Sequence, residues 1–456
     1  MALTVEQVVG MAPDDSSVKA GRKLSAERHW PKLGRVGEAL WGLCQGSGAK
    51  PYQARVDLSG PAWKCSCPSR KIPCKHSLGL MLLYAEKPGL FAAEKPCDFL
   101  AEWLADRQER AAQKEQKQAE KAGEVAADPE ALARRQEAKT KRAASREDKV
   151  ADGIAELALF VTDLARQGLA SVAGKPYGFW DGMAARLVDA QAPGLARQIG
   201  RLGSASRSGE GWQQRLLRLA GRLHLACAAW PRIDSLPNPL RADLRAFVGF
   251  STPQEEVQTE RGVPDDWYVF AQSVLNEDGV RFARTWYWGG NDQRAAVIHQ
   301  YAYANQPLQL PHGPGTALRG ELAFFPSVAP WRALLKEGAP AAQIPFARPP
   351  GLHSLDAMLA AFAGTLAENP WAESRAYLLD SVLPLHQGDH WQLQDTAGIA
   401  LPLCVAGDDG WELLSLSGGQ PLTVFGEWDG TRFLARAAIG EDDRLHCLTM
   451  PGKTDG

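Results

Sequence analysis

Four potential metal ligands lie within twelve residues of one another, and this cluster constrains the fold of the chain more than any other feature. They are Cys65, Cys67, Cys74 and His76. Three thiolates and one imidazole form a common ligand set for a closed tetrahedral zinc site. The residues between them are mostly polar, so the segment offers little apolar surface for burying cysteines as small hydrophobes. We therefore expect one structural zinc ion held by these four side chains.

The first ligand pair is typical of the end of a β-hairpin. Cys65 and Cys67 are two residues apart, so on an extended segment their side chains point to the same face. Pro68 then removes a backbone donor and ends the strand. Residues 52–58 alternate in the manner of a preceding strand. The pair is thus expected to project from the end of a two-stranded hairpin.

The second ligand pair is typical of the start of a helix. Cys74 and His76 precede a mostly apolar run, residues 77–84, which Pro88 and Gly89 follow. This arrangement predicts a helix that begins near the ligands and ends before the proline. The free N–H groups at a helix start favour a thiolate there. The whole unit is therefore expected to be β-β-α, with the metal joining the hairpin to the helix.

At these residues the chain resembles the SWIM zinc finger family. The family pattern is Cys-x-Cys, a variable gap, then Cys-x-His before a helix, and all four ligand positions are filled here. The flanking residues 41–52 also look like stand-alone bacterial members, and the resemblance is specific over about residues 20–90. It implies zinc binding, with DNA binding or protein contact as roles. Bacterial relatives often look like members of operons with an ATPase and a metal-binding, adhesion-type protein.

Basic charge is concentrated in the part of the chain that holds the zinc ligands. Residues 1–80 contain twelve Lys or Arg and six Asp or Glu, a balance of +6, although the whole chain of 456 residues has a net charge of −2. Binding of nucleic acid would therefore have to use a local patch. The candidate phosphate contacts within the finger are Arg55, Lys64, Arg70, Lys71 and Lys75.

Basic residues interspersed with tryptophans also precede the finger. They are Lys19, Arg22, Lys23, Arg28, Lys32 and Arg35, with Trp30 and Trp41 among them. Such residues can bind phosphates and stack on bases. A solvated face with the tryptophans packed beneath it is the alternative.

Cysteine usage and hydropathy indicate a cytoplasmic protein. Only three of the eight cysteines fall in the cluster, which suits a reducing compartment better than a disulfide scaffold. The first ten residues lack the basic start and apolar core of a secretory signal. We find no apolar run long enough to span a membrane.

Composition divides the chain into five regions of an α+β multidomain protein. We expect a zinc-finger domain (1–100), a charged linker that is helical or disordered (101–153), a helical bundle (154–250), an antiparallel β meander (251–350), and a helix followed by a small β barrel (351–456). In the last region six short strands are expected, including one at residues 411–416. Strand aromatics such as Trp286 and Trp288 are expected in the core, with a ligand-facing sheet as the alternative.

Motifs of the common enzyme classes are missing from the sequence. It lacks a phosphate-binding loop, a nucleophile elbow and a His-Glu-x-x-His zinc motif. The acidic doublets 265–266 and 442–443 are expected in turns, where carboxylates accept backbone hydrogen bonds. A zinc ion with four protein ligands has no open position for water. We therefore expect a protein that is not an enzyme, and two functions remain open.

The first function is nucleic-acid binding, with DNA as the partner, through the basic patch of the finger. The alternative is protein–protein docking, in which the finger is a module of a cytoplasmic scaffold with ATPase and adhesion-type partners.

Overall fold

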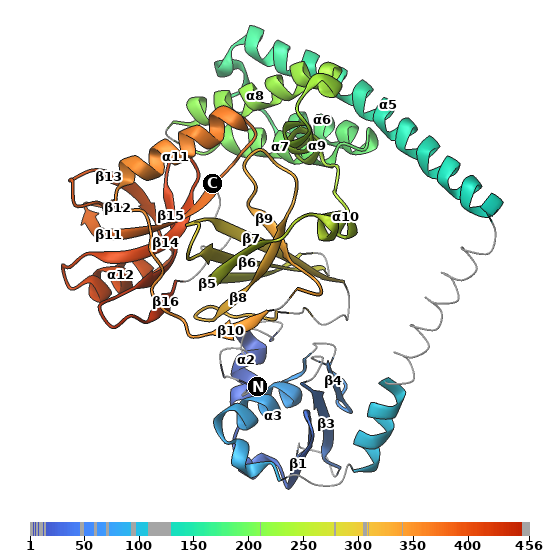
Figure 1. The fold of residues 1–456 in the computed structure, drawn as a ribbon, viewed down its shortest axis with the longest axis vertical. Helices are drawn as coiled ribbons and strands as arrows, with labels where there is room; N and C mark the ends of the chain where they lie inside the picture. Colours follow the sequence, from blue (N-terminus) through green and yellow to red (C-terminus); the bar gives the residue numbers. More distant parts are fainter. Residues whose placement is uncertain are drawn as a thin grey trace. The chain divides into compact units, whose positions relative to one another are not determined.

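The computed structural model describes two compact units of an α+β protein. The described residues are 15–45, 50–58, 62–69, 73–92, 97–107, 129–209, 211–277, 280–303, 310–339 and 341–448, with a few isolated positions. The first unit, here the finger unit, holds residues 1–135 with the short segments 274–282 and 300–311. The second, here the carboxyl-terminal unit, holds the remainder. The mixed α+β multidomain class expected from the sequence is confirmed (Figure 1).

The finger unit is built on one antiparallel sheet. Its strands follow the chain in the order β1 (Lys32–Val36), β2 (Ala39–Cys44), β3 (Tyr52–Asp57) and β4 (Ala62–Cys65). Helix α3 (Lys75–Glu86) follows β4 and gives the β-β-α unit that the ligand spacing predicts. Helix α2 (Asp15–Arg22) precedes the sheet, and residues 98–107 form a further helix after it.

Helices cover both faces of this sheet. Leu40 and Val56 point to the face where α3 packs, and both are fully buried. Trp41, the next residue along β2, points to the other face and packs against Leu100 and Trp103 of the helix at 98–107. Since side chains alternate along a strand, one sheet supplies two small cores. The finger unit thus extends past residue 100.

Two glycines allow α2 to lie directly on α3. A Cβ placed at Gly79 would lie 2.8 Å from Leu24 Cβ and 3.2 Å from Gly21 O. A Cβ placed at Gly21 would lie 2.8 Å from Leu78 Cβ. The backbones of α2 and α3 therefore approach closely, which holds α2 beside the start of α3.

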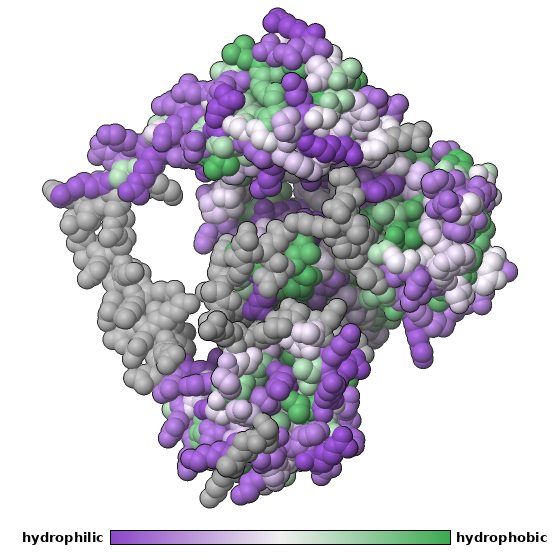
Figure 2. All heavy atoms as spheres, turned by 180° about the vertical axis from the view of Figure 1, so that it is seen from behind, coloured by the Kyte–Doolittle hydropathy of each residue, from purple (hydrophilic) through white to green (hydrophobic). Residues whose placement is uncertain are grey.

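One long helix, α5 (Pro129–Gln167), runs from the charged linker into the bundle. It passes without a break through residues 153 and 154, where the sequence suggests a boundary. Its apolar stripe begins at Val150, which is fully buried, and continues with Ile154 and Leu157. Figure 2 shows mostly hydrophilic residues along its amino-terminal part. The part of α5 that packs in the bundle therefore begins near Val150, inside the helix rather than at its first residue.

The bundle packs α5 against four further helices of the carboxyl-terminal unit. They are α6 (Tyr177–Asp189), α7 (Pro193–Ala205), α8 (Trp212–Ala229) and α9 (Asn238–Val248). Their shared core includes Leu164, Trp180, Ile199, Leu216 and Leu244. Among the described residues, none of the helices is both long enough and apolar enough to cross a membrane.

Two β barrels follow the bundle, and we name them barrel 1 and barrel 2. Barrel 1 comprises β5 (Val263–Glu277), β6 (Val280–Gly289), β7 (Ala295–Tyr303), β8 (Ala317–Phe324), β9 (Arg332–Leu335) and β10 (Ala342–Ile344). Barrel 2 follows α11 (Leu355–Glu368) and comprises β11 (Arg375–Gln387), β12 (His390–Gln394), β13 (Ala400–Cys404), β14 (Leu422–Trp428), β15 (Phe433–Ile439) and β16 (Leu445–Cys447).

The two barrels share one strand order. In barrel 1, β9 pairs in parallel with β7 and antiparallel with β8, which closes the meander that the sequence predicts. In barrel 2, β13 pairs in parallel with β15, and β15 pairs with β14. We number β5–β9 of barrel 1, and β11–β15 of barrel 2, as strands 1–5. Both barrels then close in the order 1-2-3-5-4-1, with strands 3 and 5 parallel, which is the order of an OB-type barrel.

The prediction of a strand at residues 411–416 is wrong, because the structure has helix α12 (Asp409–Ser417) there. Gly410, Leu413 and Ser417 are buried at helical spacing, whereas Trp411 is exposed. Gly418 adopts a left-handed conformation, with φ of 54°, and ends the helix. The helix lies between the third and fourth strands of barrel 2.

Aromatic side chains join the two barrels. Phe270 of β5 stacks on Phe425 of β14, with ring centroids 4.8 Å apart. Trp286 and Trp288 of β6 belong to the same core as Leu378 of β11. Trp286 and Trp288 are each at most 1% exposed, so they are core residues rather than a ligand-facing surface.

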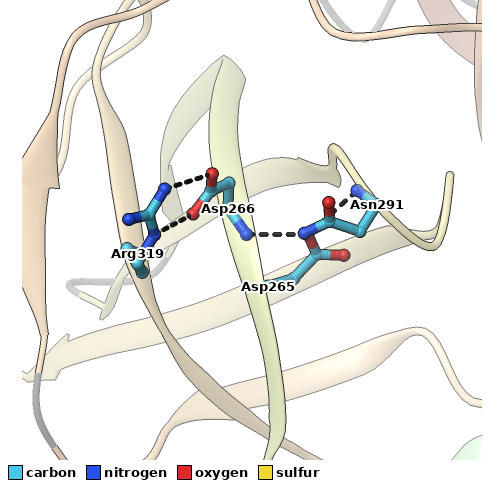
Figure 3. Close-up of polar contacts among 4 residues, drawn as sticks. All are labelled: Asp265, Asp266, Asn291 and Arg319. Carbon is cyan, nitrogen blue, oxygen red and sulfur yellow. Dashed lines mark hydrogen bonds and ion pairs between the residues drawn. The ribbon is translucent and has the colours of Figure 1, made fainter.

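The acidic doublet at residues 265 and 266 lies in strand β5 and not in a turn, as shown in Figure 3. Asp265 accepts hydrogen bonds from the backbone N–H of Asn291 at 3.0 Å and from its Nδ2 at 2.6 Å. Asp266 forms two hydrogen bonds with Arg319 of β8, at 2.7 and 2.9 Å. The pair thus fixes the β6–β7 turn and the β5–β8 pairing.

The contact between α2 and α3 predicts a penalty for a single methyl group. Gly79→Ala should destabilise the finger unit by about 1–3 kcal/mol, because overpacking outweighs the better helix propensity of alanine. Gly89→Ala is the matched control, since a Cβ there meets nothing within 4 Å. Hydrogen exchange of α3 in the full chain measures the effect. Equal protection of α3 in both variants would contradict the close packing.

Candidate metal centre

The four predicted ligands come from the end of a strand and the start of a helix. Cys65 is the last residue of β4, and Cys67 follows it by two residues. Cys74 is the N-cap of α3, and His76 lies in its first turn. Their ligand atoms all lie within 4.8 Å of one another. The structure therefore brings together all four residues that the sequence selects.

The distances fit a tetrahedral zinc ion. The Sγ atoms of Cys65 and Cys74 lie 3.7 Å and 4.0 Å from Nδ1 of His76. With Zn–S near 2.3 Å and Zn–N near 2.0 Å, a tetrahedral angle separates sulfur and nitrogen by about 3.5 Å. Nδ1 is thus the histidine nitrogen placed for coordination. The set is consistent with one structural zinc ion.

Backbone pairing and ring stacking hold the ligands in place. Ser66, between the first two cysteines, donates its N–H to Gln53 O at 3.1 Å. Its hydroxyl accepts from Gln53 N at 2.9 Å. The Tyr52 ring stacks on the His76 imidazole, with centroids 4.6 Å apart and an angle of 28° between the planes. The cysteine loop and the imidazole are therefore both oriented by β3.

The thiols differ in acidity in the metal-free cluster. A hydrogen bond from the Cys65 thiol, with further bonds from His76 and Ser77, lowers the pKa of Cys74 to about 3. The same bond and burial raise the pKa of Cys65 above its ordinary value. Burial also raises the pKa of Cys67. Without metal, Cys74 is the thiolate and the other two cysteines keep their protons at neutral pH.

Burial makes this a closed site. Cys74 is 5% exposed and His76 is 4% exposed, because α3 packs against the sheet. Four protein ligands leave no coordination position for substrate. Zinc held here would stabilise the fold, since it fixes β4 to the start of α3.

The candidate phosphate contacts have different surroundings. Lys64 and Lys75 are exposed, each next to a zinc ligand in the sequence. Arg55 is only 8% exposed, and its Nη1 donates to Phe99 O at 2.8 Å. Arg55 therefore stabilises the packing of the helix at 98–107 on the sheet and is not available to a ligand. Arg70 and Lys71 lie outside the described residues.

A groove of about 360 Å³ runs beside the ligands. It is lined by α2 on one side and by the cysteine loop and α3 on the other, through Ser16, Ser17, Ala20, Tyr52, Cys67, Pro68, Ser69, Lys75 and His76. The α2 serines were not among the predicted site residues. Their position depends on the contact between Gly21 and Gly79, and the sequence carries no local signal for that contact.

Zinc content tests the ligand set. Cys67→Ser should abolish tight zinc binding and unfold the finger unit, because structural zinc contributes about 10 kcal/mol or more to such folds. The carboxyl-terminal unit should keep its protection from proteolysis. Cys447→Ser, at an exposed cysteine of barrel 2, is the control and should retain one zinc per chain. Atomic absorption and limited proteolysis measure both outcomes; loss of zinc from the control would contradict the assignment.

The pKa values of the thiols predict proton release. Zinc requires thiolates, so binding at neutral pH should release about two protons, from Cys65 and Cys67. Affinity should consequently fall as pH falls, by up to about a hundredfold per pH unit. Titration calorimetry in two buffers of different ionisation enthalpy counts the protons. Zinc binding without proton release would contradict the protonation states described above.

Two family models match the chain. Residues 54–85 match the SWIM zinc finger, which covers most of β3, all of β4 and most of α3. Residues 145–248 match the SWIM-associated four-helix bundle domain, which covers the buried part of α5 and the helices through α9. No curated protein and no solved structure is detectably similar to the chain. With its four zinc ligands in place, the chain contains a SWIM zinc finger followed by a SWIM-associated four-helix bundle domain.

Proposed function

We propose that this protein is not an enzyme and that its zinc finger binds nucleic acid, with DNA as the partner. The observation that carries the proposal is the position of Lys75, whose side chain lines the groove between α2 and the zinc ligands. Phosphate groups bind where ammonium groups and hydroxyl donors converge. We define the basic surface as Lys75 of α3, Lys19 and Arg22 of α2, and Lys23, which follows α2 directly.

Exposed charge supports this proposal. The described side chains of residues 16–92 include nine exposed basic residues and three exposed acidic ones. The basic residues are Lys19, Arg22, Lys23, Arg28, Lys32, Lys50, Lys64, Lys75 and Lys87; the acidic ones are Glu27, Glu38 and Glu86. Zinc with three thiolates adds a charge of about −1, which leaves the exposed surface clearly positive. The electrostatic field of this surface therefore favours binding of a polyanion.

The groove has the chemistry of a phosphate contact. Lys75 supplies the positive charge, and the exposed residues Ser16 and Ser69 also line the groove. The contacts go to the sugar–phosphate backbone, so they are expected to be insensitive to base sequence. Tyr52 also lines the groove, but its ring already stacks on His76. The proposed interaction is therefore electrostatic rather than base-specific.

Substitution of the lysine that lines the groove tests the proposal. Lys75→Ala should weaken binding of a random DNA duplex and reduce the slope of log K against log salt by about 0.9. Fluorescence anisotropy of the full chain across a salt series measures both quantities. Zinc content should be unchanged, since Lys75 is not a ligand.

Lys87→Ala is the matched control, because Lys87 lies at the opposite end of α3, about 18 Å from Lys75 along the helix axis. An equal effect at Lys87 would show that binding does not use the groove. Absence of DNA binding at low salt would remove the proposal. It would leave the alternative, docking of the finger on a protein in an assembly with ATPase and adhesion-type partners.

A further inference from the structure

A cluster of aromatic rings lies on the surface of barrel 2. His386 from β11 contacts Trp391 of β12 and Trp411 of α12, with ring centroids 4.4 and 4.8 Å away. The two indoles meet edge to face, with centroids 5.0 Å apart. Trp411 is 53% exposed and His386 is also exposed. Large apolar side chains that stay exposed on a folded domain often mark a binding surface.

The backbone around the cluster is fitted to the rings. A Cβ placed at Gly410 would lie 2.3 Å from the Trp391 indole, so α12 can pack there only with glycine. This contact holds Trp411 beside Trp391. The exposed ring is therefore preorganised for contact with a ligand, which lowers the entropic cost of binding.

A groove of about 510 Å³ adjoins the aromatic cluster. Its floor is formed by β12 and β13, through His390, Trp391, Gln392, Pro402, Leu403, Cys404 and Val405. Asp389 of the β11–β12 turn and Arg432 of the β14–β15 turn close its sides. The second and third strands and these two turns form the ligand-binding face of OB-type barrels.

The equivalent face of barrel 1 is already covered. Trp286 and Trp288 of β6 and Val297 of β7 pack into the core shared with barrel 2. Barrel 2 contributes β11, β14 and β15 to that core, through Leu378, Phe425 and Ile439. Its own β12–β13 face lies outside the core and carries the groove.

Charge indicates which ligand fits. Residues 375–448 contain four arginines, no lysines and eleven Asp or Glu, a balance of −7. Three exposed acids lie within three residues of a ring of the cluster in the sequence: Asp389, Asp408 and Glu412. Arg432, the basic residue of the groove, lies 3.6 Å from Asp429. The surface therefore disfavours a polyanion and favours a cation.

We propose that barrel 2 binds an extended peptide segment of a partner protein through an arginine or lysine side chain. The cationic group stacks on the exposed Trp411 ring, where cation–π attraction and the nearby acids act together. The peptide backbone continues along the β12–β13 groove, where Gln392 and His390 offer hydrogen-bonding groups. This site is independent of the finger and of its nucleic-acid binding.

The test uses the full chain and two labelled decapeptides of alternating glycine with arginine or with glutamate. The arginine peptide should bind, and Trp411→Ala should weaken it about tenfold, since a cation–π contact on a half-exposed ring lies between the exposed and the desolvated values. Glu412→Gln should weaken it less, and the glutamate peptide should not bind. Trp411 is half exposed, so circular dichroism should confirm that its variant is folded.

Leu217→Ala is the control, because Leu217 is an exposed apolar residue of the bundle at 61% exposure. It should leave peptide binding unchanged. Equal binding by the wild type and by Trp411→Ala would overturn the proposal. So would binding of a ten-residue thymidine strand that Trp411→Ala abolishes, because this would assign the face to single-stranded nucleic acid.

Discussion

The finger unit depends on the coordination that joins the end of β4 to the start of α3. Cys65 and Cys67 belong to the hairpin, and Cys74 and His76 belong to the start of the helix, so one ion joins two elements of the unit. Lys75 lies between two of the ligands in the sequence, so the same coordination fixes the position of its positive charge beside the groove. A small fold with a limited core gains both stability and a defined charged surface from one ion.

The carboxyl-terminal unit has cores that owe nothing to the zinc. The bundle buries a continuous apolar set from Val150 to Val248, and the barrels share the aromatic core around Phe270 and Phe425. Segment 369–375 joins the bundle to the barrels: Arg222 donates to Pro370 O at 3.1 Å, and Gln198 donates to Glu373 at 2.8 Å. These contacts connect the bundle to the barrels within the carboxyl-terminal unit.

Local chemistry in the sequence is enough to predict the metal site. The features that the sequence does not predict depend on packing between segments that lie far apart along the chain. The ligand spacing identified all four zinc residues because coordination demands particular atoms at short range. Residues 411–416 are apolar enough for either a strand or a helix, and their packing on Trp391 decides for the helix. Arg55 is buried by Phe99, forty-four residues away along the chain. Barrel 1 closes through parallel pairing of β7 and β9, and such pairing of distant strands produces no recognisable pattern in the local sequence.

The two barrels have the same strand order, but the faces of their second and third strands have different surroundings. In barrel 1 the face of the second and third strands is covered, because its tryptophans pack against Leu378 and Phe425 of the neighbouring barrel. In barrel 2 the same face carries glutamine, histidine and proline, with the aromatic rings displaced to its margin. Burial of the apolar face of barrel 1 stabilises the fold. The polar groups on the face of barrel 2 would be costly to bury, so this face stays exposed to solvent. Side chains rather than topology therefore determine which barrel can bind a partner.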